Sequence, residues 1–276
     1  MNIPKRIIQT GKTRSLSALA KAAETNIKLL HPDWEYVYFD DTDIVRFVAT
    51  EFPQYQEIFD GFPRTIQRID FFRYLAVYRF GGFYFDLDVF LSESLTPLLD
   101  FGCVFSFEEL TLNRYLRQEY GMDWEIGNYA FGSAPNHPYL SAVIQNCVRA
   151  QRDPAWVEPM MAGIPPFGRA EFEVLYSTGP GLLSRTLAEY PDSASDLTVL
   201  FPEDVRDEEN WHQFGCYGVH LMDASWRTRG SYLRRRLMLA WESWSRKRLM
   251  PESRQSGPTR KLPVSRAPEA ALVSIT

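Results

Sequence analysis

The hydrophobic pattern of the first 90 residues alternates between strand and helix periods, and this alternation restricts the fold more than any other feature. Arg6 to Thr10 is a β-rich run that ends at Gly11, and a stretch with helical spacing follows from about Ser17 to Leu30. A second strand, Trp34 to Phe39, precedes a short helix from Ile44 to Phe52. Strands that alternate with helices predict an α/β sheet, in which ligands bind where the strands end.

The clearest pattern lies between residues 65 and 90. Thr65 to Phe80 carries apolar residues at helical spacing, and Gly81-Gly82 provides a C-terminal cap. Phe83 to Phe90 is predicted to be the next strand. Asp86 and Asp88 are one residue apart on this strand, so we expect both carboxylates on the same face.

Two carboxylates that converge can bind a hard divalent cation, one directly and the other through water or a ribose hydroxyl. An isolated Asp-x-Asp is more often a solvated turn, because short motifs recur without function. Here the neighbours Phe83, Phe85 and Val89 indicate a buried strand, where a charge is costly without a partner. A metal ion would be such a partner.

Asp70 and Arg73 are three residues apart on the helix before the glycine pair, so they share one face. They form either a surface ion pair, which contributes ~0–1 kcal/mol, or a binding pair. In the second interpretation Asp70 accepts a sugar hydroxyl and Arg73 donates to a phosphate or sugar oxygen.

The order of these residues resembles that of family 32 of the DXD-containing glycosyltransferases, which includes fungal α-mannosyltransferases and bacterial capsule enzymes. The large clostridial glucosylating toxins look like distant relatives. The resemblance covers about residues 3–226 and rests on ordered motifs rather than on composition. These motifs are Ile3-Pro4-Lys5 with Gln9 and Thr10, Asp70, Arg73, Gly81-Gly82, Tyr84, Asp86, Asp88, Asn128-Tyr129-Ala130, Asn136-His137-Pro138, Thr178-Gly179-Pro180, and His220 with Ser225-Trp226.

The resemblance implies a GT-A fold, in which a Rossmann-like mixed sheet is flanked by helices. It further implies an enzyme that binds a nucleotide sugar with Mn²⁺ or Mg²⁺ and transfers a hexose with retention of configuration. A UDP-sugar is the favoured donor and GDP-mannose the alternative. The expected acceptor is a glycan, a glycolipid such as a lipid-linked glycan, or a polysaccharide. We expect a front-face mechanism, in which the departing phosphate helps to deprotonate the acceptor.

The resemblance also implies which residues hold the metal. Asp88 is expected to ligate the ion directly, and Asp86 to contact the ribose or a metal-bound water. His220 is the candidate for a further metal or diphosphate contact. Because the residues after His220 depart from the family pattern, Asp223 or Ser225 could share this role.

The donor contacts follow from the same resemblance. Asp70 and Arg73 are expected to contact the donor sugar, and Asn128 falls where the family places a residue that faces this sugar. Together with Asp86 and Asp88, these three residues are the candidate catalytic group. The remaining predicted donor contacts are Gln9, Thr10 and Trp226, of which Trp226 closes over the diphosphate.

The sequence departs from the family at the end of the first predicted strand. Ile8 stands where many members have His, and Gly11 stands where many have Trp. If that aromatic residue packs near the base, this chain must hold its base in another way. The aromatic candidates are Trp34, Tyr36 and Phe39.

Two other functions remain open. A phosphatase of the haloacid dehalogenase type would use Asp86 and Asp88 as nucleophile and acid, but it normally needs a downstream lysine. This chain has no lysine between Lys28 and Lys247. A non-catalytic sugar-binding scaffold would tolerate the loss of either aspartate, yet both are present.

The predicted domains are a glycosyltransferase domain at 1–228, a basic amphipathic helix at 229–249 and a disordered tail at 250–276. Residues 1–226 carry 18 basic and 32 acidic side chains, a balance that argues against nucleic acid as the main partner. The helix either packs on this acidic domain, which we favour, or lies on an anionic membrane surface. Its apolar face comprises Leu233, Leu237, Ala240, Trp241 and Trp244.

Composition favours a cytoplasmic location. No apolar run approaches the roughly 18 residues of a membrane span, and the start, MNIPKRIIQTGKT, lacks the apolar segment of a signal peptide. Three widely spaced cysteines suggest neither a disulfide framework nor a zinc site. We therefore expect a cytoplasmic protein, peripheral at the inner membrane face if the basic helix binds lipid.

Overall fold

The computed structural model describes residues 2–190, 196–205, 207–222, 237 and 240–246. A six-stranded sheet lies at its centre, in the order β2-β1-β3-β6-β5-β7. β6 is antiparallel to its neighbours β3 and β5, whereas the pairs β1–β2, β1–β3 and β5–β7 are parallel. These strands are β1 (Arg6–Thr10), β2 (Glu35–Phe39), β3 (Gly82–Phe85), β5 (Cys103–Leu110), β6 (Trp124–Ser133) and β7 (Leu197–Leu200).

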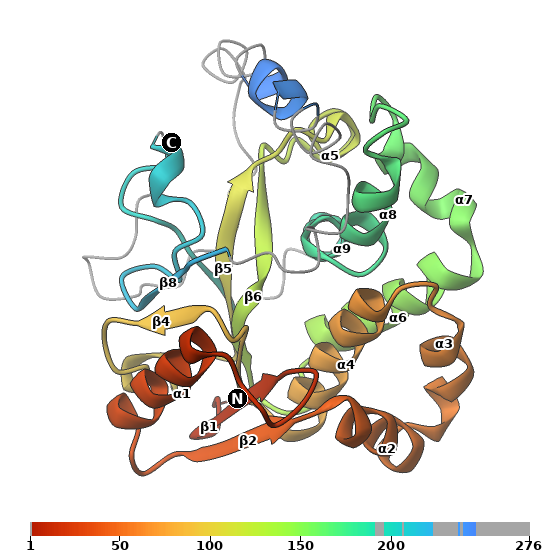
Figure 1. Cartoon of the computed structure of the whole chain (residues 1–276). Helices are drawn as coiled ribbons and strands as arrows, with labels where there is room; N and C mark the ends of the chain where they lie inside the picture. Colours follow the sequence, from red (N-terminus) through yellow and green to blue (C-terminus); the bar gives the residue numbers. More distant parts are fainter. Residues whose placement is uncertain (1, 191–195, 206, 223–236, 238–239, 247–276) are drawn as a thin grey trace.

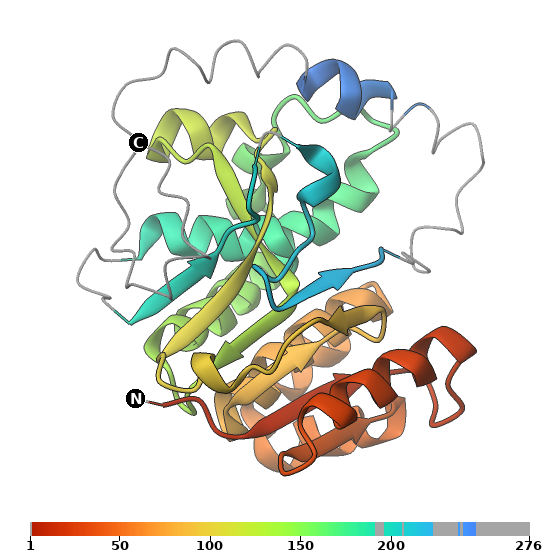
Figure 2. The same cartoon turned by 90° about the vertical axis from the view of Figure 1, so that its left-hand side faces the viewer.

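Helices cover one side of this sheet, and a two-stranded antiparallel sheet with one helix covers the other (Figure 1). The small sheet pairs β4 (Val89–Leu91) with β8 (Gly218–His220), and both lie with α1 in front of the central strands in Figure 2. The helices are α1 (Ala18–Leu30), α2 (Asp41–Glu51), α3 (Gln56–Gly61), α4 (Thr65–Phe80), α5 (Arg114–Tyr120), α6 (Pro138–Arg152), α7 (Pro154–Val157), α8 (Arg169–Ser177) and α9 (Pro180–Glu189).

Two hydrophobic cores lie on opposite faces of the central sheet. Successive strand residues point to opposite faces, so Ile8 and Tyr84 enter the core beneath α4, α6 and α9. Their neighbours Ile7 and Phe83 enter the smaller core beneath α1 and β4. The predicted α/β class, with a mixed sheet flanked by helices, is confirmed.

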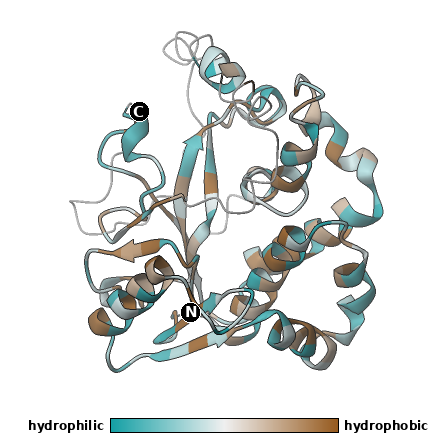
Figure 3. Cartoon of the chain, in the orientation of Figure 1, coloured by the Kyte–Doolittle hydropathy of each residue, from teal (hydrophilic) through white to brown (hydrophobic). Residues whose placement is uncertain are grey.

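α4 begins and ends where the sequence predicts. Buried residues surround the helix on all sides, as in an element that lies inside the fold, and in Figure 3 hydrophobic residues follow its length. Gly81 ends it with a φ of 64°, and its N–H donates to the carbonyl of Val77 at 2.8 Å. A Cβ at Gly81 would lie 2.7 Å from Pro4, so only glycine fits this turn.

The acidic cluster after β2 caps a helix. Asp40 accepts hydrogen bonds from the N–H groups of Thr42 and Asp43, and the Asp43 side chain accepts one from the N–H of Asp40. This capping box starts α2 at Asp41, three residues before the predicted start at Ile44.

The predicted single strand from Phe83 to Phe90 is wrong. β3 ends at Phe85, residues 86–88 form a turn, and β4 joins the other sheet. The break follows from the charges, because two carboxylates inside a six-stranded sheet would be buried without water. The N–H of Val89 donates to the carbonyl of Asp86 at 3.2 Å and closes this turn.

Part of the predicted C-terminal helix is described. Residues 237 and 240–246 are helical, while the rest of 229–249 and the predicted tail at 250–276 lie outside the described residues. The Trp241 ring packs edge-on against Phe172 of α8, with ring centroids 5.6 Å apart. Among the described helices, none has both the length and the apolar composition needed to cross a bilayer.

Candidate active site

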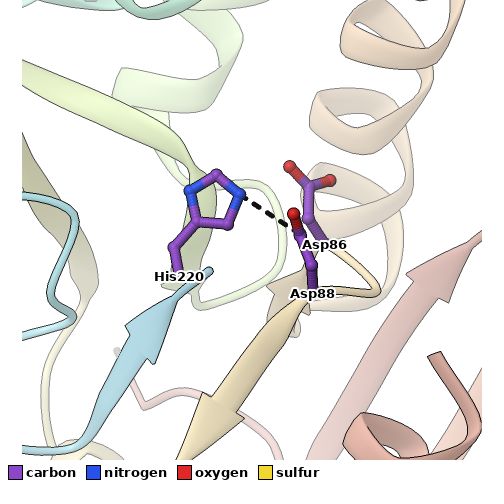
Figure 4. Close-up of side chains that lie close together, drawn as sticks. All are labelled: Asp86, Asp88 and His220. Atoms are coloured by element: carbon purple, nitrogen blue, oxygen red, sulfur yellow. Dashed lines mark ion pairs between the residues drawn. The ribbon is translucent and has the colours of Figure 1, made fainter. Parts of the chain in front are cut away.

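Three side chains converge at the carboxyl end of β3 (Figure 4). Asp86 and Asp88 come from the turn between β3 and β4, and His220 is the last residue of β8. One potential ligand atom from each lies within 4.8 Å of those of the other two. The structure thus brings together the three residues predicted as metal ligands, although His220 is far from the aspartates in sequence.

β-Pairing places His220 beside the turn. His220 lies opposite Val89 in the β4–β8 register, and the N–H of Leu221 donates to the carbonyl of Asp88 at 3.0 Å. The imidazole stacks on the Tyr129 ring at a centroid distance of 4.4 Å. Its Nε2 lies 3.1 Å from Oδ1 of Asp88. Burial acts to lower the pKa of His220, but the hydrogen bond to Asp88 and the charge of Asp86 raise it above its ordinary value.

The donor set fits a divalent cation. Two carboxylates offer the hard oxygens that Mg²⁺ and Mn²⁺ prefer, and a neutral imidazole is a better ligand for Mn²⁺ than for Mg²⁺. All three side chains are partly exposed, so water can reach them. Asp86, Asp88 and His220 would therefore hold the ion.

Arg73 of α4 joins this turn to a buried carboxylate. Its Nη1 lies 3.3 Å from Asp86 Oδ1, and its Nη2 lies 3.1 Å from Asp70 Oδ1. Nη1 also donates to the carbonyl of Asn128 at 2.8 Å. The guanidinium lies over the Tyr84 ring, 4.7 Å from its centroid, which fixes its plane.

Hydrogen bonds to both oxygens hold Asp70. Asn128 Nδ2 donates to Oδ1 at 3.0 Å, and Thr178 Oγ1 donates to Oδ2 at 2.9 Å. Burial raises the pKa of Asp70 to about 6, although Arg73 and these hydrogen bonds act in the opposite direction. Asp70 and Arg73 therefore form a buried pair, and the interpretation as a surface ion pair is wrong.

An irregularity in β6 aims Asn128 at Asp70. Phe105 and Ser106 are adjacent on β5, yet they pair with Phe131 and Gly127 on β6. Residues 128–130 therefore have no partner on β5 and form a bulge. In this bulge Asn128 points toward α4 while the Tyr129 ring points toward β8.

Gln9 and Thr10 lie behind the aspartate turn. Gln9 Nε2 donates to the carbonyl of Asp86 at 3.2 Å, and the Gln9 Oε1 accepts from the hydroxyl of Tyr36. Thr10 Oγ1 lies 3.1 Å from the hydroxyl of Tyr84, which donates to Asp86 Oδ1. Gln9 and Thr10, which were predicted to contact the nucleotide sugar, are both buried and position Asp86 through these hydrogen bonds. The other predicted residues, Trp226, Asp223 and Ser225, lie outside the described residues.

Sequence reasoning gave no role to several residues that complete this network. Tyr74 lies one helical turn after Asp70 on α4, and its hydroxyl accepts from Asn128 and donates to the carbonyl of Thr178. Tyr84 lies on β3, two residues before Asp86, and its hydroxyl donates to that carboxylate. Spacing could have identified Tyr74 and Tyr84. Thr178 belongs to one of the family-like motifs, but no local signal indicates that it reaches Asp70 from the end of α8.

Comparisons with known proteins find similarity to glycosyltransferases. Residues 18–105 match the family model described as glycosyltransferase sugar-binding region containing DXD motif. Inositol phosphoceramide mannosyltransferase 3 of Schizosaccharomyces pombe is 29% identical over 239 residues, which cover 81% of this chain and 60% of that protein. Inositol phosphoceramide mannosyltransferase 2 of the same yeast is 34% identical over 211 residues, covering 74% and 54%. The chain thus spans 54–60% of the length of these two relatives.

Among solved structures, the UDP-bound glycosyltransferase domain from the YGT toxin is similar over 94% of this chain and 92% of that chain. The sequence identity is 8% and the TM-score is 0.49.

Proposed function

We propose that this chain is a metal-dependent glycosyltransferase, because residues 18–105 match the glycosyltransferase sugar-binding region that contains a DXD motif. It moves a hexosyl group from a nucleotide sugar to a hydroxyl of a glycan or glycolipid. The observation that carries this proposal is the convergence of Asp86, Asp88 and His220, whose potential ligand atoms lie within 4.8 Å of one another. The two aspartates belong to the matched region, and His220 lies next to them in space. The resemblance found in the sequence is confirmed at the level of this family.

The residues around the site have different roles in this proposal. Asp86, Asp88 and His220 would hold a divalent cation, and this ion would supply charge that stabilises the leaving diphosphate. Arg73 keeps the Asp86 carboxylate in place. Asp70 and Asn128, which hydrogen-bond to each other, would orient the donor sugar.

The bonding of Asp70 supports the front-face mechanism. A retaining enzyme that forms a covalent intermediate needs a carboxylate free to attack the anomeric carbon. Asp70 is 3% exposed, and both of its oxygens accept hydrogen bonds. Asp86 and Asp88 face the proposed cation, which lowers their nucleophilicity. We therefore keep retention of configuration, with the departing phosphate as the base, as part of the proposal.

The names of the relatives favour a mannosyl group and a glycolipid acceptor, since both are called inositol phosphoceramide mannosyltransferases. GDP-mannose, the alternative donor in the sequence analysis, thus becomes as strong a candidate as a UDP-sugar. An acceptor on a lipid requires the chain to work near a membrane surface. The cytoplasmic location stays a prediction.

The phosphatase alternative has less support than the glycosyltransferase. Asp86 would be its nucleophile, yet Oδ1 of Asp86 accepts from Tyr84 at 2.8 Å and lies 3.3 Å from Arg73 Nη1. Both the family match and the relatives' names favour sugar transfer. The non-catalytic scaffold remains as the outcome to expect if no donor is turned over.

The test is turnover of UDP- and GDP-sugars with Mn²⁺, measured as release of the nucleoside diphosphate. We expect one donor to be hydrolysed and Asp88→Asn to reduce this rate by at least about 100-fold, because a metal contributes several kcal/mol to the barrier. Asp100→Asn, an exposed residue before β5, is the matched control and should retain wild-type turnover. Donor hydrolysis that is unchanged by Asp88→Asn or by chelation would contradict the proposal.

A further inference from the structure

Gly11, directly after β1, has no room for a side chain. A Cβ at this position would lie 2.1 Å from the hydroxyl oxygen of Tyr38 and 2.9 Å from Leu87 Cδ1. Leu87 lies between the two aspartates of the candidate metal site, so Gly11 adjoins that site. The space that a larger residue would fill after β1 is therefore occupied from the neighbouring strand by Tyr38.

Tyr38 is fixed in this position. It lies opposite Gln9 in the parallel β1–β2 register, one residue before the end of β2. Its hydroxyl donates to the carbonyl of Thr13 at 2.7 Å and so anchors the loop between β1 and α1. The side chain is only partly buried, and the Arg14 guanidinium lies 5.9 Å from the ring centroid.

The three aromatic residues suggested by the sequence are engaged elsewhere. Trp34 is buried between His31 and Phe83 in the smaller core. The Phe39 ring packs against two phenylalanines in the larger core. Tyr36 donates its hydroxyl to Gln9, and its ring carries a lysine ammonium 4.0 Å from the centroid. Tyr38 is therefore the partly exposed aromatic ring of β2 that lies next to Gly11.

This position suits a nucleotide. In an open α/β sheet, ligands bind at the carboxyl ends of parallel strands, and both Gly11 and Tyr38 lie at that end of β1 and β2. Leu87, which adjoins Gly11, lies between Asp86 and Asp88, so a nucleoside bound here would lie beside the proposed cation site. An aromatic face can stack on any base, which gives affinity without selecting one.

Resting on the proposed function, we propose that Tyr38 is the stacking platform for the nucleobase or ribose of the donor, made possible by the absence of a side chain at Gly11. Tyr38 thus takes the place of an aromatic residue on β1. The competing interpretation is that Tyr38 serves only as an anchor for the loop through its bond to Thr13. The two interpretations differ in which part of the side chain matters.

The test compares Tyr38→Leu with Tyr38→Phe by calorimetric titration with UDP, GDP and pyrophosphate, each in the presence of Mn²⁺. Tyr38→Leu removes the ring and should weaken binding of the nucleotide that wild type prefers by about tenfold, the scale of one base stack. Pyrophosphate, which has no base, should bind both variants and wild type equally. Tyr38→Phe keeps the ring, loses the bond to Thr13, and should retain nucleotide affinity.

A transplanted ring provides an independent test. Gly11→Trp alone should bind the nucleotide poorly, because the new side chain and Tyr38 compete for the same space. Adding Tyr38→Leu vacates that space, so the double variant should recover most of the affinity lost by either single variant. Thermal unfolding of each variant shows whether it is folded.

Failure of this proposal is distinguishable from failure of the proposed function. If wild type binds none of UDP, GDP and pyrophosphate with Mn²⁺, both proposals are wrong. Suppose that wild type binds a nucleotide. If Tyr38→Leu then loses affinity for pyrophosphate and nucleotide equally, only the stacking platform is wrong. The same holds if Tyr38→Phe loses as much nucleotide affinity as Tyr38→Leu. Unchanged nucleotide affinity in Tyr38→Leu would likewise overturn it.

Discussion

Asp70 has a structural role in addition to the role proposed for it in sugar binding. Asp70 and Arg73 are each 4% exposed at the side chain, and they lie 3.1 Å apart. Removing one partner of a buried ion pair leaves the other charge without compensation and costs about 3–5 kcal/mol. Substitution of either residue would lower stability and the proposed sugar binding together, so the two effects could not be separated. Substitution of a residue that contacts Asp70 gives a better test of its role.

Thr178 is that neighbour. Thr178→Val keeps the shape of the side chain but removes the donor to Asp70 Oδ2, which leaves a buried carboxylate oxygen unsatisfied. We expect a loss of about 1–3 kcal/mol in the free energy of unfolding, measured by urea titration. Donor turnover should fall with it, because Asp70 loses its orientation.

Thr178→Ser provides the control, since it retains the hydroxyl and should restore both stability and turnover. Equal stability of Thr178→Val and wild type would mean that the hydrogen bond to Asp70 contributes nothing.

The raised pKa of Asp70 makes a second prediction. Its pKa is about 6 in the folded chain and lies near 3.8 in an unfolded one, so the folded state binds the proton more tightly. The unfolded state then releases this proton as pH rises, and the free energy of unfolding falls between about pH 4 and pH 6. Asp70→Asn removes this contribution.

Urea titrations from pH 4 to pH 7, without added metal, measure the effect. As pH rises, the free energy of unfolding of wild type should fall relative to that of Asp70→Asn. A difference that is constant over this range would show that Asp70 does not titrate there.

Two acidic residues lie directly opposite each other on the paired strands β5 and β6. They are Glu109 and Glu125, and two like charges in this position destabilise the strand pair. Burial, with a smaller contribution from the charge of Glu109, raises the pKa of Glu125 to about 8. Arg246 of the C-terminal segment binds Glu109, and Thr111 donates to Glu125, so both carboxyl groups have partners.

Glu125→Gln should stabilise the chain at high pH. Because the folded pKa lies above the unfolded value near 4.5, the stability contributed by protonated Glu125 is complete below pH 4.5 and lost as pH rises through 8. Glutamine stays neutral, so the melting temperature of the variant relative to wild type should increase from pH 5 to pH 8.5. Glu119→Gln, an exposed residue of α5, should show no such change. If the melting temperatures of wild type and Glu125→Gln fall by the same amount as pH rises, this expectation is wrong.

Elements with strong local signals were predictable, and those set by tertiary pairing were not. α4 has helical spacing and a glycine cap, so both of its ends agree with the prediction. The break after Phe85 depends on β4 pairing with β8, which lies far along the chain. Likewise, the bulge at residues 128–130 arises from the β5 register and leaves no trace in local composition. The sequence could therefore identify Asp86, Asp88 and His220 by family resemblance, but not the hydrogen bonds that orient them.

At the scale of the whole molecule, the C-terminal segment contacts the domain through Arg246 and Trp241, whereas Leu237 and Trp244 of its predicted apolar face are exposed. Arg246 forms ion pairs with Glu109 of β5 and Glu208, and its guanidinium lies over the Trp211 ring. Trp241 contacts Phe172. These contacts favour the first interpretation of the basic helix, in which it packs on the acidic domain. Contact with an anionic membrane stays a prediction.

The two tryptophans of this segment give a matched pair of variants. Trp241→Ala removes a ring that packs against the larger core and should lower the free energy of unfolding by about 1–2 kcal/mol, less than for a fully buried tryptophan. Trp244 is 55% exposed, so Trp244→Ala should change stability by less than about 0.5 kcal/mol. Urea titration measures both. If Trp244→Ala proves the more damaging variant, the segment does not pack as described.

The pairing of β4 with β8 has a consequence for biosynthesis. A nascent polypeptide that ends before β8 already contains Asp86 and Asp88, but it lacks the imidazole of His220. Until β8 is made and pairs with β4, the proposed cation site would consist of two carboxylates alone. The three candidate ligands can therefore assemble only after all six strands of the central sheet have been translated.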